Sequence, residues 1–185
     1  MSPKVYKAFN DIINEHYSGE NIDKVLEIGT YHWSLLDIDK FKNSEKTGLN
    51  ISFSDLEKKM LSGKFTLVEG NTNNLSFADS QFDCVMSCSV FEHDKYFWKS
   101  LSEISRVIKK GGLFVVGIPI YMSLKTDIKN TTLTYHRHGL SYNADFYRFS
   151  EQAAQEVLLD GYDIKYSKIV RKYPNPYLVI AGIKK

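Results

Sequence analysis

The sequence of 185 residues has few cysteines and prolines, no long apolar segment and no excess of one charge sign. Its two cysteines, Cys84 and Cys88, lie in one short apolar segment, at a spacing too tight for an unstrained disulfide along a strand. We therefore expect unbridged thiols in a reducing, cytoplasmic compartment. The four prolines fall singly, which excludes a proline-rich linker.

Partners of two kinds are not expected. No apolar run approaches the roughly 20 residues that a membrane-spanning helix needs. Lys4, Lys7, Asp11 and Glu15 interrupt the first apolar positions, so a signal peptide is not expected either. Lys plus Arg number 24 and Asp plus Glu 22, which gives a formal charge of +2 and little attraction for a phosphate backbone. Neither a membrane nor a nucleic acid is thus an expected partner.

The hydrophobic content of 43% is enough for one compact domain over residues 1–185. Apolar residues at helical spacing predict three helices. These are an N-terminal helix within residues 1–20, a helix from Tyr96 to Ile108, and a helix that Ser150 caps and Gly161 ends. The segment Lys109–Gly112 is expected to close the second helix, because cations and glycine suit a helix C-terminus.

Short apolar runs between the helices predict strands, and the longer stretches that separate them are expected to carry crossover helices. The runs are 24–29, 47–52, 65–69, 82–87, 112–119, 162–170 and 177–183. The last two are joined by a short loop, which predicts an antiparallel pair. The predicted fold is α/β: a Rossmann-like three-layer sandwich with a mostly parallel seven-strand sheet and one antiparallel strand near the C-terminus.

In an open α/β sheet, ligands bind beyond the carboxyl ends of the strands. Several sequence blocks at and near these ends carry a resemblance to a known family, in their order and spacing. They are Val25–Thr30, Gly48–Ser52, Val68–Phe77, Phe82–Met86, Phe91–His93 and Glu103–Gly112. In these blocks the chain resembles the class I S-adenosylmethionine-dependent methyltransferases, in particular the type 11-like group that modifies small molecules and glycans.

The resemblance implies that S-adenosyl-L-methionine lies across the strand ends, with S-adenosyl-L-homocysteine as the product. Each strand end is then expected to face one part of this cofactor. Glu27, Gly29, Thr30 and Tyr31 would face the methionine part, Asn50 and Ile51 the ribose, Asn71, Thr72 and Asn73 the adenine, and Ser87, Cys88 and Ser89 would form the floor.

The chain departs from the family pattern at these positions. Tyr31 and Trp33 stand where the family usually has glycines, which adds bulk where backbone normally approaches the ligand. Asn50 replaces a usual carboxylate, and Asn71 replaces a common Asp. These departures keep open an alternative function, a catalytically silent module that binds a nucleoside or a partner protein.

Methyl transfer is an in-line displacement, so it needs a base only when the acceptor is a hydroxyl. His93 follows the fourth predicted strand and is the candidate base, because imidazole titrates near neutrality. The equally open alternative is a structural histidine bonded to backbone in the following turn.

The segment 120–149 is expected to be an insertion on the substrate side of the sheet. Its candidate substrate-binding residues are His136, Arg137, His138, Tyr147 and Arg148. Aromatic rings with cationic donors suit a sugar or aromatic acceptor that carries an anionic group, although a solvated loop is an equal alternative. The two histidines lack a third ligand at recognisable spacing, so no metal is expected.

The predicted function is S-adenosylmethionine-dependent methyl transfer to a small-molecule or saccharide acceptor at oxygen. A chain of 185 residues leaves little room for a separate substrate domain. We expect a lid that is short or that a second subunit of a homodimer supplies. An RNA methyltransferase is disfavoured by the near-neutral charge and the lack of a basic extension.

Overall fold

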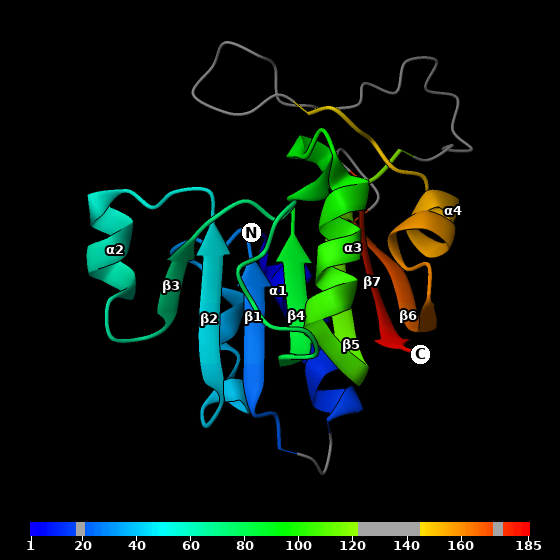
Figure 1. The fold of residues 1–185 in the computed structure, drawn as a ribbon. Helices are drawn as coiled ribbons and strands as arrows, with labels where there is room; N and C mark the ends of the chain where they lie inside the picture. Colours follow the sequence, from blue (N-terminus) through cyan, green and yellow to red (C-terminus); the bar gives the residue numbers. More distant parts are fainter. Residues whose placement is uncertain (18–20, 122–144, 172–175) are drawn as a thin grey trace.

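The computed structural model describes residues 1–17, 21–121, 145–171 and 176–185, which form a seven-stranded sheet between two layers of helices (Figure 1). The strand order is β3-β2-β1-β4-β5-β7-β6. The strands are β1 Lys24–Ile28, β2 Glu45–Asn50, β3 Thr66–Glu69, β4 Phe82–Cys88, β5 Ile108–Pro119, β6 Tyr162–Arg171 and β7 Tyr177–Lys184. The helices are α1 Pro3–His16, α2 Asp55–Leu61, α3 Phe97–Val107 and α4 Glu151–Ala153, with short 3-10 helices η1 Leu35–Asp37, η2 Asp39–Phe41 and η3 Phe91–His93 and a π-helical turn η4 Ala154–Leu158.

The direction of the strands confirms the predicted sheet. Strands β1 to β5 pair in parallel, and β7 pairs antiparallel with both β5 and β6, so β7 is the one reversed strand. Ile28 at the end of β1 lies opposite Leu49 of β2 and Ser87 of β4. The carboxyl ends of these strands therefore meet at one edge of the sheet.

Each face of the sheet has its own apolar core. On one face, α1 and the turns η1 and η2 cover Cys84, Met86 and Val115 with side chains such as Phe9 and Phe41. On the other face, α3, α4 and η4 cover the alternate side chains of the same strands. Because both faces are buried, the central strands are predominantly apolar, as expected for a parallel sheet.

Two predicted crossover helices are absent from the described residues. Between β1 and β2 the chain forms only η1 and η2, because Ile38 adopts an extended conformation with ψ 126° and ends the turn that Ser34 caps. Between β3 and β4, residues 70–81 form turns with no helix. The prediction of a helix in each long connection was therefore wrong at these two places.

The end of α3 and the start of α4 can be compared with the helix boundaries that the sequence predicts. Helix α3 ends at Val107, and Ile108 already pairs with Phe82 of β4, so β5 begins earlier than predicted. The Ser150 hydroxyl accepts a hydrogen bond from Ala153 N at 3.0 Å, which confirms the predicted cap. No helix of the described residues is long and apolar enough to cross a membrane.

Candidate functional site

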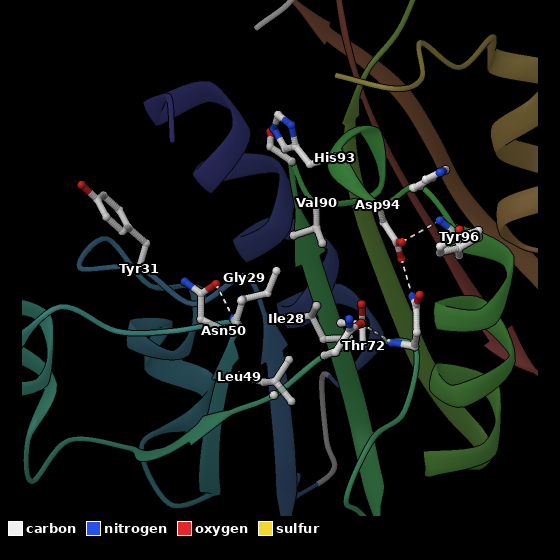
Figure 2. Close-up of a pocket in the computed structure, with 16 residues that line it drawn as sticks. Ile28, Gly29, Tyr31, Leu49, Asn50, Thr72, Val90, His93, Asp94 and Tyr96 are labelled. Atoms are coloured by element: carbon white, nitrogen blue, oxygen red, sulfur yellow. Dashed lines mark hydrogen bonds between the residues drawn. The ribbon is translucent and has the colours of Figure 1, made fainter. Parts of the chain in front are cut away.

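A pocket with a volume of about 460 Å³ opens at the carboxyl ends of β1 to β4 (Figure 2). Its lining comes from the last residues of β1 and β2 and from the segments that follow the four strands. The lining residues are Ile28, Gly29, Tyr31, Leu49, Asn50, Ile51, Gly70, Asn71, Thr72, Asn73, Ser89, Val90, His93, Asp94, Lys95 and Tyr96. Nine of the residues predicted to bind the cofactor or to act as base are among them: Gly29, Tyr31, Asn50, Ile51, Asn71, Thr72, Asn73, Ser89 and His93.

The first loop is held closely against its neighbours at Gly29. The amide groups of Gly29 and Thr30 donate to the Leu49 carbonyl at 2.8 and 3.1 Å. Gly29 has φ +80°, and a Cβ there would lie 2.5 Å from a methyl group of Val90. Only glycine is compatible with both the conformation and the contact. The single glycine of this loop is thus required by the packing of the loop itself.

The bulky residues of the first loop do not fill the pocket. Tyr31 lies at its outer edge, with 51% of its surface exposed (Figure 2). Trp33 does not line the pocket and is 64% exposed. The expected crowding of the ligand by these two rings is therefore not seen at the centre of the pocket.

Asn50 joins the end of β2 to the first loop. Its amide nitrogen donates to the Thr30 carbonyl at 3.0 Å, and its side-chain oxygen accepts from Ile51 N at 2.8 Å. A carboxylate at this position has no hydrogen to donate to the Thr30 carbonyl. The asparagine therefore has a structural role, and its oxygen retains a second lone pair for a ligand hydroxyl.

Glu27 and Thr30 are buried and do not line the pocket. The Glu27 carboxylate accepts hydrogen bonds from the Ser34 hydroxyl and, at 3.1 Å, from Leu35 N, so it holds the start of η1. Burial raises the pKa of Glu27 to about 7. Both side chains, predicted to face the cofactor, make hydrogen bonds within the first loop, since the Thr30 hydroxyl donates to the Glu27 carbonyl at 2.9 Å.

The segment after β3 forms one wall of the pocket, the adenine-side wall, and is hydrogen-bonded to helix α3. The Asn71 side-chain oxygen accepts from Asn73 N at 2.9 Å. The Asn73 side-chain amide donates to Asp94 at 2.8 Å and to the buried Ser100 hydroxyl at 2.7 Å. Ser100 in turn lies 2.7 Å from the Thr72 hydroxyl. These bonds fix the three predicted adenine-side residues relative to α3.

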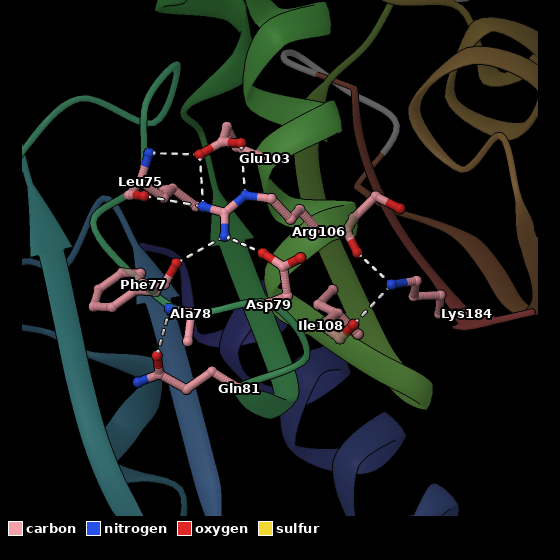
Figure 3. A network of polar contacts seen from close by, with 10 residues as sticks. Leu75, Phe77, Ala78, Asp79, Gln81, Glu103, Arg106, Ile108 and Lys184 are labelled. Carbon is pink, nitrogen blue, oxygen red and sulfur yellow. Dashed lines mark hydrogen bonds and ion pairs between the residues drawn. The ribbon is translucent and has the colours of Figure 1, made fainter.

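Arg106 of α3 holds the continuation of the same loop (Figure 3). Its guanidinium donates to the carbonyls of Leu75 and Phe77 at 3.0 and 2.8 Å. Glu103 pairs with Arg106 and accepts from Leu75 N at 2.8 Å. The loop between β3 and β4 therefore needs no helix of its own, because α3 satisfies its backbone.

The predicted floor at the end of β4 is only partly in the pocket. Ser89 lines it with φ +56°, whereas Ser87 is fully buried and its hydroxyl has no hydrogen-bond partner among the described residues. Cys88 packs on the opposite face of the sheet, where its sulfur lies 3.1 Å from the Tyr177 hydroxyl. Burial raises the pKa of the Cys88 thiol to about 11, so the thiol is neutral.

His93 lies at the upper edge of the pocket, with 21% of its side chain exposed (Figure 2). Its Nδ1 is 3.1 Å from Oδ1 of Asp145. Asp145 was not predicted as a site residue, because it is far from His93 in the chain and no motif joins the two. Asp94, Lys95 and Tyr96, which follow the predicted Phe91–His93 block and line the pocket, were not predicted either.

The predicted substrate residues divide into two groups. His136, Arg137 and His138 lie outside the described residues. Tyr147 donates to the Lys95 carbonyl at 2.9 Å, and Arg148 pairs with Asp145, so both make contacts within the protein. Within the described part of the chain, no three His, Cys, Asp or Glu residues gather as a metal site would require.

A family model described as a methyltransferase domain matches residues 26–116. This match runs from β1 into β5 and includes the strand ends that line the pocket. Residues 26–116 of this chain form a class I methyltransferase domain. Sterol 24-C-methyltransferase ERG6B of Gibberella zeae is 35% identical over 128 residues, which cover 62% of this chain and 33% of that protein. This methyltransferase chain spans about a third of the length of the curated sterol methyltransferases that it matches.

Solved structures share the fold at low sequence identity. One is the crystal structure of Burkholderia thailandensis 1,6-didemethyltoxoflavin-N1-methyltransferase with bound 1,6-didemethyltoxoflavin and S-adenosylhomocysteine. Its TM-score is 0.74 at 15% sequence identity, and the match covers 97% of this chain and 77% of that chain. A methyltransferase structure from Methanosarcina mazei has a TM-score of 0.68 and 19% identity, with 100% and 98% covered. These likenesses extend the methyltransferase fold to the strands β6 and β7.

Proposed function

We propose that the protein transfers the methyl group of S-adenosylmethionine to a hydroxyl of a small-molecule or saccharide acceptor. The observation that carries the proposal is the pocket at the ends of β1 to β4, which is lined by residues of four of the six sequence blocks that resemble the family. Its volume of about 460 Å³ is within the range of small-ligand sites.

The residues of the pocket fit a nucleoside. Asn71 offers amide hydrogens, and Asn50 offers the second lone pair of an oxygen that one backbone amide already orients. Ile28, Leu49 and Val90 supply an apolar surface between these polar groups. Because the polar groups are fixed by their own hydrogen bonds, ligand binding would order few side chains.

An oxygen acceptor is supported by His93, which lines the pocket and could receive the hydroxyl proton. The fungal relatives are named as sterol 24-C-methyltransferases, which supports a small-molecule acceptor as the broader class. Since this chain spans only about a third of their length, we do not propose a sterol as its acceptor.

Two observations favour the alternative, a nucleoside-binding module without activity. The loop after β1 lacks a full helix, and both polar groups of the Asn50 side chain already have partners in the protein. The experiment that follows separates the two functions in two stages.

The first stage is calorimetric titration of the protein with S-adenosylhomocysteine. We expect micromolar binding that weakens by about fivefold in Asn50→Ala, since one hydrogen bond contributes roughly 1 kcal/mol. The matched control is Asn43→Ala, because Asn43 is exposed and outside the pocket. Absence of binding by folded wild-type protein would contradict the proposal.

The second stage uses S-adenosylmethionine with a labelled methyl group and a panel of hydroxylated small molecules and saccharides. Transfer of label to oxygen supports the proposed enzyme. Binding without transfer to any member of a broad panel favours the silent module, whereas transfer to carbon or nitrogen would refute the assignment of the acceptor atom.

A further inference from the structure

Four ionisable side chains form a cluster beside the pocket, which we call the His93 cluster: Glu92, His93, Asp145 and Arg148. Asp145 Oδ1 lies 3.1 Å from His93 Nδ1, and Asp145 Oδ2 pairs with Arg148. Glu92 Oε1 lies 3.8 Å from His93 Nε2. The two halves of the cluster come from η3 and from the segment that precedes α4.

Backbone hydrogen bonds fix these two halves relative to each other. The amides of Phe146 and Tyr147 donate to the Glu92 carbonyl at 2.7 and 3.3 Å. The Phe149 carbonyl accepts from Tyr121 N at 3.1 Å at the end of β5. Asp145 is therefore held against His93 by the fold and does not depend on a ligand to reach it.

The surroundings of the Asp145 carboxylate strengthen its effect on His93. The Asp145 side chain is 3% exposed and that of Arg148 is 15% exposed, so water screens the cluster weakly. Arg148 also donates to the Tyr147 carbonyl at 3.3 Å, which fixes its guanidinium. A buried carboxylate at Nδ1 selects the ring tautomer with hydrogen on Nδ1 and stabilises the imidazolium when a proton arrives at Nε2.

We propose that Asp145 is the positioning residue that holds His93 as the general base of methyl transfer. This inference rests on the proposed function. In the step, the acceptor oxygen forms a bond to the methyl carbon while the bond from that carbon to sulfur breaks and its electron pair stays on sulfur. The hydroxyl proton moves to Nε2 of His93, and the carboxylate of Asp145 balances the new positive charge.

Other charged groups also surround the histidine. Glu92 is adjacent on η3, Arg148 lies behind Asp145, and Asp94 and Lys95 line the same pocket. Burial raises the pKa of Glu92 to about 7, so near neutrality this carboxyl is partly protonated. Asp145, which contacts His93 Nδ1 and pairs with Arg148, is the counter-ion that we assign to the imidazolium.

The test uses histidine labelled with 15N, because nitrogen chemical shifts report tautomer and protonation without an identified acceptor. The His93 signal is assigned by comparison with His93→Gln. In wild-type protein we expect the neutral ring to carry its hydrogen on Nδ1. A ring that carries it on Nε2 would overturn the proposal without need of any further variant.

The variant Asp145→Asn is then titrated with pH. We expect the midpoint of the His93 titration to fall by about one pH unit or more, because a neighbouring opposite charge is lost. Asp145→Glu should restore part of the shift. Asp163→Asn is the control, because Asp163 is exposed and pairs with Lys165 on β6. An unchanged midpoint in folded Asp145→Asn would refute the role.

Titration of the same variants with S-adenosylhomocysteine separates this proposal from the proposed function. Unchanged binding in Asp145→Asn together with a shifted His93 midpoint supports both. Binding with an unshifted midpoint leaves the methyltransferase and removes the Asp145 role. Once the acceptor is identified, Asp145→Asn should lower kcat by about 10- to 100-fold without changing KM for S-adenosylmethionine. An unaltered kcat would contradict the role of Asp145.

Discussion

Gly29 is the residue on which the first loop most depends. In Gly29→Ala, the new methyl group would lie 2.5 Å from Val90 in a backbone conformation with φ +80°. We expect the free energy of unfolding to fall by about 2–4 kcal/mol, the sum of backbone strain and overpacking. Urea unfolding measures it.

Gly63 provides the matched control for Gly29. It has φ +79°, but a Cβ there would meet nothing within 4 Å. Gly63→Ala should therefore show the backbone cost alone, about 1 kcal/mol. In the double variant Gly29→Ala/Val90→Ala, the free energy of unfolding should rise again by the amount by which Gly29→Ala is less stable than Gly63→Ala. Equal losses in Gly29→Ala and Gly63→Ala would show that the contact with Val90 is unimportant.

At the scale of single residues, the sequence identified most of the pocket but not the partners of its residues. Gly29, Asn50 and Asn71 follow strand ends, and that rule is local in the chain. The bond between Asn50 and Thr30 and the contact between His93 and Asp145 join distant segments. Such pairs depend on tertiary packing, so no spacing in the sequence reveals them.

At the scale of elements, helix α3 orders the adenine-side wall through Ser100. Ser100 is fully buried and contacts Thr72, Asn73 and Asp94. Ser100→Ala should lower the free energy of unfolding by about 1–3 kcal/mol, because buried polar groups lose a partner. We also expect weaker binding of S-adenosylhomocysteine in calorimetry.

The control for Ser100→Ala is Ser102→Ala on the exposed side of the same helix. It should leave both stability and binding nearly unchanged, since alanine suits a helix at least as well as serine. If Ser100→Ala behaved like Ser102→Ala, the wall would not depend on α3.

A substitution of Arg106 tests whether the β3–β4 loop also depends on α3 further along its length. Arg106→Gln removes the donors to the carbonyls of Leu75 and Phe77 (Figure 3). Hydrogen exchange should become faster in the loop at residues 70–81, while exchange in β1 and β4 changes little. Uniform acceleration across the sheet would instead indicate a general loss of stability.

The connections between elements were the least predictable part of the fold. Chain length between strands predicts room for a helix, but the side chains that cap turns decide whether one forms. In the first connection, Ser34 and Glu27 fix the start of η1 and the extended Ile38 ends it. Arg106 satisfies the backbone of the β3–β4 loop from outside that loop. Both effects require the folded molecule.

For the whole molecule, two buried carboxyls predict that stability falls as pH rises from about 5 to 7. The pKa values of Glu27 and Glu92 are each raised from 4.5 to about 7 by burial. In this window the folded state keeps protons that the unfolded state has lost, so the free energy of unfolding decreases. Each carboxyl contributes at most about 3 kcal/mol to this decrease.

Urea unfolding at several pH values checks this dependence. Glu92→Gln should flatten the decrease, because its amide does not titrate, whereas Glu15→Gln on the exposed face of α1 should keep it. A decrease of the same size in Glu92→Gln and in wild-type protein would exclude Glu92 as a source.

The order of strands was predictable only in part. Alternating apolar runs gave the α/β class and the antiparallel pair, because these are properties of neighbouring segments. Strand β7 lies between β5 and β6, so that Ile180 of β7 pairs with Val116 of β5. The spacing of apolar runs in the sequence contains no information about this position of β7.

The position of β7 also governs when the protein can fold during its synthesis. Strand β7 follows β6 in the chain but separates β6 from β5 in the sheet. Until the ribosome has released β7, strand β5 has an open hydrogen-bonding edge, and β6 has no neighbour in the sheet. A chain in which β7 has not yet formed thus exposes an unpaired strand edge at β5, the kind of edge that can pair with other chains.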